Sequence, residues 1–205
     1  SNKLQETKVM AKTKEKEVDW SQTKDAPVKR ALHAMAALES GKILMYGGCD
    51  KGTYFNDAYF FSITNDKTGK EEGEWKRTND GPGKRYTHAM QTLGSGKILM
   101  YGGYNGTNVL GGSFIFSTSS QTGKEKSRWT RINVEAPGRR FGHAMSTVEP
   151  GKILMYGGLD NTFNLLKTSY IFSTSSKTGT EEYKWTKIVG GPGDGPGVRC
   201  YHAMV

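Results

Sequence analysis

Short apolar runs alternate with longer polar, glycine-rich segments along this chain, and the alternation repeats. The clearest run is the block Gly-Lys-Ile-Leu-Met-Tyr-Gly-Gly, which occurs three times without change and begins at residues 41, 96 and 151. Each copy therefore starts 55 residues after the copy before it. A fixed period of this length is the sequence signature of an architecture built from repeated structural units.

The middle repeat shows what one unit contains. An apolar run bounded by glycines predicts a short buried strand, and Phe114 and Phe116 share one face of another strand because side chains alternate at a period of two. The four strands are expected at residues 86–93, 97–101, 112–118 and 128–133, with a turn in the polar stretch 119–127. No helical periodicity of comparable length competes with this reading, except in the charged N-terminus.

Two further features recur in register with the block. Each unit opens with Arg-x-x-His-Ala-Met, and a tryptophan falls on the expected last strand. The arginines are Arg30, Arg85, Arg140 and Arg199, and the tryptophans are Trp20, Trp75, Trp129 and Trp185. Four antiparallel strands in a unit of about 50 residues are typical of a propeller blade.

The residues also resemble those of kelch repeats. The resemblance rests on the Gly-Gly doublet, an aromatic residue on the next strand (Tyr59, Phe114, Tyr170), the tryptophan on the last strand, and Pro-x-x-Arg before each unit. It covers residues 12–205. The fold class expected is therefore all-β: a kelch-type β-propeller of four-stranded antiparallel blades with about 55 residues per blade.

The ends of the chain suggest an incomplete ring. Residues 12–35 align with 67–90, which gives Trp20 a last-strand position without preceding strands, and 199–205 read as the start of a new first strand. We expect a polar N-terminal segment over 1–11, followed by a propeller over 12–205 that contains a lone outer strand, three whole blades and the start of a fourth. Propellers usually have 4–8 blades, so this chain is expected to be part of a larger ring, with self-association as the less favoured option.

Composition narrows the compartment and the class of partner. The 205 residues are 35% hydrophobic, carry a net charge of +9 and include only two cysteines, Cys49 and Cys200, neither of which recurs in the repeats. Two unrepeated cysteines favour a reduced, cytoplasmic location over a disulfide framework. No apolar run is long enough to span a membrane and no signal peptide is visible. Because the lysines are mixed with glutamates in polar turns, a solvated surface is favoured over nucleic-acid binding.

The candidate binding residues come partly from the kelch resemblance. In that family the loop before the first strand and the loop after the doublet contribute to a binding face, where arginines can hold acidic motifs. The resemblance therefore implies that the four repeated arginines lie on such a binding face. The alternative is that their role is purely structural. The loops that differ between repeats are the better candidates for specificity, because loops on a rigid scaffold carry function. The predicted partner-binding residues are Arg85, Arg140, Asp50, Lys51, Tyr54, Tyr104, Asn105, Asn108, Asp160, Asn161 and Phe163.

Catalysis and metal binding are not expected. Each histidine occupies the same place in its own repeat, so neighbouring histidines should lie too far apart to share a zinc ion, and a structural role is favoured. A copper oxidase resembling galactose oxidase would need a Cys–Tyr pair and two histidines at one metal, whereas Cys49 stands alone. We therefore expect no catalytic residues, no metal and no cofactor.

The function expected is a non-catalytic protein-interaction scaffold or adaptor, within a larger cytoplasmic or cytoskeletal assembly. Its partner is expected to be a protein, with an acidic one as an option; no membrane and no nucleic acid are expected. The alternatives left open are a kelch-type enzyme resembling galactose oxidase and a carbohydrate-binding module.

Overall fold

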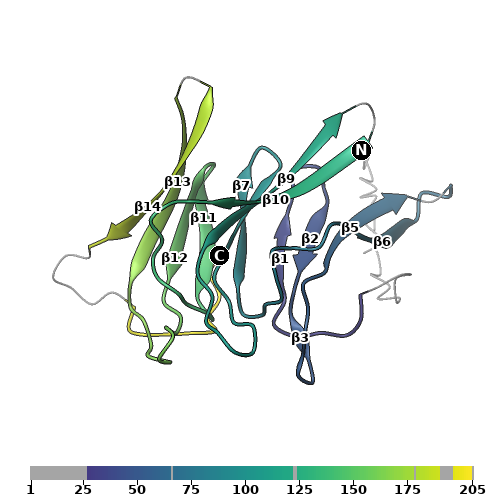
Figure 1. Cartoon of the computed structure of the whole chain (residues 1–205). Coiled ribbons are helices and arrows are strands. Elements are labelled where there is room, and N and C mark those ends of the chain that lie inside the picture. Colours follow the sequence, from purple (N-terminus) through teal and green to yellow (C-terminus); the bar gives the residue numbers. More distant parts are fainter. Residues whose placement is uncertain (1–26, 66, 122–123, 178, 190–195, 205) are drawn as a thin grey trace, which may run out of the picture.

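Three four-stranded sheets, called blades 1 to 3, lie side by side in chain order (Figure 1). The structure is a computed structural model that describes residues 27–65, 67–121, 124–177, 179–189 and 196–204. The predicted segment 1–11 and the predicted lone strand around Trp20 fall outside these residues. No helix occurs in the described part of the chain. The all-β propeller architecture predicted from the sequence is therefore confirmed.

Each blade is an antiparallel sheet whose strands follow one another along the chain. Blade 1 contains β1 (Ala34–Ala37), β2 (Ile43–Tyr46), β5 (Ala58–Asn65) and β6 (Glu71–Arg77). Blade 2 contains β7 (Ala89–Gly94), β8 (Lys97–Tyr101), β9 (Ser113–Gln121) and β10 (Lys124–Ile132). Blade 3 contains β11 (Ala144–Glu149), β12 (Lys152–Tyr156), β13 (Ser169–Lys177) and β14 (Thr180–Ile188). A two-stranded sheet, β3 (Cys49–Asp50) and β4 (Thr53–Tyr54), follows the first doublet.

The repeated block supplies both faces of its blade. Because side chains alternate along a strand, Leu and Tyr of the block point to the next blade while Ile and Met point to the previous one. Between blades 1 and 2, Leu44 and Tyr46 pack with Ile98 and Met100; the same types meet between blades 2 and 3. Tyr46, Tyr101, Met100 and Met155 are fully buried.

The outward faces of blades 1 and 3 expose residues that are buried elsewhere. Met35 on blade 1 is 42% exposed, whereas its counterpart Met90 is 5% exposed. Val148 on blade 3 is 60% exposed, whereas its counterpart Leu93 is 5% exposed between blades 2 and 3. Equivalent positions therefore have different burial, depending on whether another blade lies against them. Completion of a larger ring remains a prediction.

Three strand boundaries differ from the expectation by three or four residues. The stretch 119–127 is not a turn: β9 runs to Gln121 and β10 starts at Lys124, with Ser119 paired to Lys126. The polar residues stay extended here because β9 and β10 pair with each other beyond the apolar core. Figure 1 shows the β9–β10 hairpin projecting from its blade. The first strand starts at Ala89 rather than at residue 86, since Thr87 has a φ of 54° and breaks the extended backbone.

Candidate functional site

The loop after each doublet is held against the segment that opens the same blade. In blade 2, Tyr86 and Tyr104 exchange two backbone hydrogen bonds of 2.9 Å, which form an isolated bridge. Ala31 with Cys49 and Phe141 with Leu159 make the same contact in blades 1 and 3. The variable loops are therefore fixed to the repeated scaffold at the point where their side chains diverge.

Six aromatic rings form a continuous series over these loops, which we call the aromatic strip. It consists of Tyr54, Tyr86, Tyr104, Phe141, Phe163 and Tyr201, and draws on segments of all three blades. Ring centroids of successive neighbours are 5.3 to 6.3 Å apart, and Tyr54 stacks on Tyr86 at an interplanar angle of 7°. Such offset and edge-to-face contacts are the arrangements that aromatic rings prefer.

Exposure differs between the rings of the strip and is greatest at Phe163 and Tyr201. Phe141 is buried, and Tyr54, Tyr86 and Tyr104 are half-buried. Phe163 and Tyr201 are each 59% exposed. The strip therefore has a packed base and two large rings that remain open to solvent.

Two glycines let the rings lie flat on the backbone. A Cβ placed on Gly106 would come within 2.2 Å of the Tyr54 ring, and one on Gly142 would come within 3.2 Å of the Tyr201 ring. Both glycines also have positive φ values, of 96° and 62°. The strip thus depends on residues that lack a side chain as much as on the aromatic residues themselves.

The predicted binding arginines Arg85 and Arg140 lie inside the blades. They are 4% and 2% exposed, and their Nη1 atoms donate to the carbonyl oxygens of Gly102 and Gly157 at 3.0 Å. Arg30 donates in the same way to Gly47 at 2.9 Å. This placement favours the structural alternative, in which each arginine satisfies the carbonyl of its own blade's doublet.

Arg30 has an additional acidic partner in blade 1. Its guanidinium forms a two-pronged contact with Asp57, with N–O distances of 2.6 and 2.9 Å. Burial alone would raise the pKa of the Asp57 carboxyl, but the hydrogen bonds and charge of Arg30 outweigh it and lower that pKa. The pair is thus a fixed internal ion pair.

Several predicted polar residues shape their own loops. The Asn105 Oδ1 atom accepts hydrogen bonds from the backbone N–H groups of Thr107 and Asn108, at 3.0 and 2.7 Å. The Asp160 carboxylate accepts from Thr162 and Asn164, and these hydrogen bonds lower its pKa. Side-chain turns of this kind fix loop conformation, so a change at either residue would alter the loop as well as its surface.

The remaining predicted residues sit at or near loop tips. Lys51, Asn108 and Asn161 are exposed, and Asp50 is half-buried beside the β3–β4 turn. The structure thus brings Tyr54, Tyr104 and Phe163 into one surface and leaves these four polar residues around its loops. Their part in binding stays a prediction.

Three members of the strip, Tyr86, Phe141 and Tyr201, were not predicted from the sequence. All three lie in the Arg-x-x-His segments, of which only the arginines were considered as binding residues. The available signal was the variation at the two positions between Arg and His, where three of the four repeats carry an aromatic residue.

The repeated histidines are enclosed by the blades rather than gathered at a common site. His88 and His143 are each 6% exposed, and their rings contact Tyr46 and Tyr101 edge-on. Among the described residues, no group of three or more His, Cys, Asp and Glu side chains could hold a metal ion. The expectation of no metal, no cofactor and no catalytic residue stays a prediction.

Comparisons with known proteins point to one family. The family model described as "KLHDC2/KLHL20/DRC7 Kelch-repeats domain" matches residues 2–205. Adagio-like protein 3 of Oryza sativa subsp. japonica is 25% identical over 194 residues, covering 91% of this chain and 29% of that protein. Adagio protein 3 of Arabidopsis thaliana is 27% identical over 141 residues, covering 64% and 22%.

A third relative carries the name of a dynein chain. The dynein alpha chain of the flagellar outer arm from Chlamydomonas reinhardtii is 24% identical over 188 residues, covering 87% of this chain and 4% of that protein. The chain thus spans less than a third of the length of each of these three relatives. A solved structure, "Structure of YjhT", shares the fold with a TM-score of 0.54 and 15% identity, covering 83% of this chain and 54% of that one.

Proposed function

Because this chain belongs to the kelch-repeat family, we propose that it is a non-catalytic protein-interaction module whose partner binds the aromatic strip. The kelch-repeat relatives support a protein-interaction domain. The strip is the surface of this chain that suits such a role best. It joins loops of all three blades, so a partner laid along it would contact each of the three blades.

The observation that carries the proposal is the exposure of Phe163 and Tyr201 on a rigid base. Large apolar side chains that remain exposed next to packed aromatic rings are typical of interaction sites. Aromatic residues are also enriched among the few residues that dominate binding energy. The buried ring of Phe141 contacts both, at 5.5 and 6.3 Å, so little side-chain freedom is lost when a partner covers them.

We further propose that the module acts as an adaptor or subunit within a larger cytoplasmic or cytoskeletal assembly. The name of the Chlamydomonas relative, a dynein chain of the flagellar outer arm, is consistent with such a setting for that protein. The described residues contain no helix, and therefore none that is long and apolar enough to cross a membrane.

The test replaces the two exposed rings together, as Phe163→Asn with Tyr201→Asn. Both positions have positive φ values, 64° and 54°, which asparagine tolerates better than most residues, so the loop backbone is preserved. Partners captured by the unchanged protein from cell extract, and identified by mass spectrometry, should be lost from the double variant. Thermal melting should be unchanged.

The matched control removes two exposed apolar side chains elsewhere, as Ile63→Asn with Val148→Asn, which are 62% and 60% exposed. Capture should survive in this control. Retention of the same partners by the Phe163/Tyr201 variant, or equal loss in both variants, would refute the proposed surface. Copper-dependent oxidation of a sugar by the purified protein would refute the non-catalytic role.

A further inference from the structure

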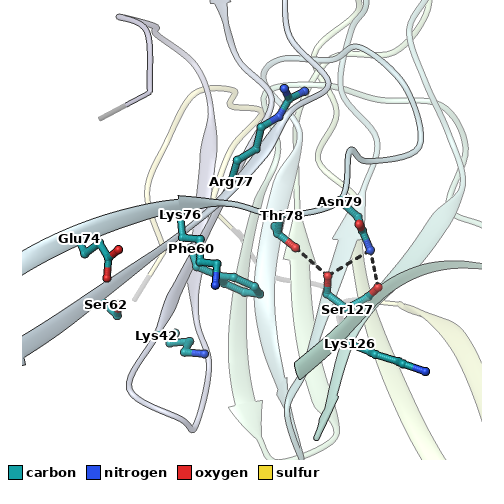
Figure 2. A pocket seen from close by; sticks show the side chains of 10 residues that line it. All are labelled: Lys42, Phe60, Ser62, Glu74, Lys76, Arg77, Thr78, Asn79, Lys126 and Ser127. Atoms are coloured by element: carbon teal, nitrogen blue, oxygen red, sulfur yellow. Dashed lines mark hydrogen bonds between the residues drawn. The ribbon is translucent and has the colours of Figure 1, made fainter. Parts of the chain in front are cut away.

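A polar groove lies between blades 1 and 2, away from the aromatic strip. Its volume is about 1120 Å³, and its walls come from β5, β6 and β10, together with Lys42 just before β2 and the residues that follow β6. No residue of the strip is among its described lining residues. Figure 2 shows Phe60 near the centre of the group, with Lys42 and Lys76 beside it and Ser127 on the facing strand.

One end of the groove is fixed by hydrogen bonds between the blades. The hydroxyls of Thr78 and Ser127 are 2.7 Å apart, and the Asn79 side-chain amide donates to the Ser127 carbonyl at 2.7 Å, as the dashed lines in Figure 2 indicate. The ammonium of Lys42 lies 5.5 Å from the centroid of the Phe60 ring. The groove therefore has a constrained end and a cation over an aromatic ring.

The equivalent groove between blades 2 and 3 is filled differently. Its volume is about 790 Å³, and it is lined by Tyr183, whose counterpart in blade 2 is Ser127. The Tyr183 ring stacks on Phe172, and its hydroxyl donates to Glu181 at 2.5 Å. The smaller side chain at Ser127 goes with the larger volume of the first groove.

The two grooves also differ in charge. Among the described lining residues, the first groove has four cationic side chains against one acidic side chain, and the second has two of each kind. The residues of the first groove are Lys42, Lys76, Arg77 and Lys126 against Glu74. Those of the second are Arg131 and Lys184 against Glu181 and Glu182. Arg77 is engaged by Asp80 at 2.8 Å, which still leaves the first groove more positive than the second.

We propose that the groove between blades 1 and 2 is a second binding surface, which takes an acidic segment of a protein partner. Carboxylates of such a segment would pair with Lys76, and would accept a hydrogen bond from whichever of the Thr78 and Ser127 hydroxyls does not donate to the other. The net charge of +9 would speed the encounter with an acidic chain, and the groove selects where it binds. The groove shares no described lining residue with the aromatic strip, so a result that refutes one binding surface leaves the other untouched.

The test measures binding of a hexaglutamate peptide by calorimetry at low salt, where exposed charges are least screened. Lys76→Glu should weaken binding by about five-fold or more, since it replaces an attraction with a repulsion. Lys184→Glu makes the same change of charge in the second groove and should leave the affinity within about two-fold. Equal weakening by both variants would show a diffuse effect of net charge and would overturn the proposal.

A second variant tests the shape of the groove without changing its charge. Ser127→Tyr places in the first groove the side chain that the second groove holds at Tyr183. The Ser127→Tyr variant should remain folded and should no longer bind hexaglutamate measurably. Undiminished binding by the folded Ser127→Tyr variant would also overturn the proposal. The Phe163/Tyr201 double variant should bind the peptide normally.

Discussion

The backbone N–H of Gly103 in blade 2 donates to the carbonyl oxygen of Arg140, which opens blade 3, at 2.9 Å. The preceding glycine, Gly102, has a φ of 65°, and a Cβ on it would lie 2.4 Å from the same oxygen. The doublet is therefore a contact between blades as well as a turn. The contact recurs at 2.9 Å between Gly48 and Arg85 and between Gly158 and Arg199.

Gly102→Val should destabilise the protein by more than about 1 kcal/mol, because a β-branched side chain is strained at positive φ and would clash with the Arg140 carbonyl. Gly52→Val is the matched control: its φ is also positive, at 83°, but nothing lies within 4 Å of the added Cβ. Urea denaturation would measure both. Equal losses would show that backbone strain alone, and not the contact between blades, sets the cost.

Arg140→Met should cost about 2–3 kcal/mol of stability, since it leaves buried carbonyl groups without their donor. In the folded protein Arg140 donates to Gly157 at 3.0 Å and to Pro137 at 2.6 Å. Arg128→Met, at an exposed position on β10, should change stability by less than about 0.5 kcal/mol. Chemical denaturation of both variants tests the structural role. If Arg140→Met lowers the free energy of unfolding as little as Arg128→Met does, Arg140 is better explained as a binding residue.

His143 should make the protein sensitive to mild acid. Burial, followed by the charges of Arg140 and His202, lowers the pKa of His143 to about 3 in the folded protein, against about 6.5 in an unfolded chain. Between these values the unfolded state binds a proton that the folded state does not. Stability should therefore be complete above pH 6.5 and fall as the pH drops towards 3, by up to about 1.4 kcal/mol per pH unit from this group.

The check is the pH dependence of unfolding for His143→Gln. Between pH 6.5 and 4 the free energy of unfolding should fall less steeply than in the unchanged protein. The slope is the informative quantity, because lost packing would lower stability equally at all pH values. Parallel curves for the two proteins would contradict a buried neutral imidazole at this position.

Leu93 and Val148 occupy equivalent positions and should respond differently to truncation. Leu93→Ala should cost about 2–5 kcal/mol, because it opens a cavity between blades 2 and 3. Val148→Ala should cost less than about 0.5 kcal/mol, because its side chain is already 60% exposed. Thermal or urea unfolding distinguishes the two, and a large loss at Val148 would mean that the outer face of blade 3 is covered in solution.

The sequence by itself determined the repeat and most of the strands. The second strand of blade 2 was predicted at the residues where β8 is found, because an apolar run bounded by glycines leaves few alternatives. The polar hairpin of β9 and β10 was mistaken for a turn, because its strands are stabilised by pairing with each other and carry no apolar signal.

Only the tertiary structure decided which repeated residues face solvent and which loop residues meet. Met35 and Met90 have the same local sequence role, yet one is exposed and the other buried, because burial depends on the neighbouring blade. The contact between Tyr54 and Tyr86 joins residues of two different blades. A periodic sequence specifies each blade through local patterning, whereas the aromatic strip and the groove arise where unlike residues of adjacent blades come together.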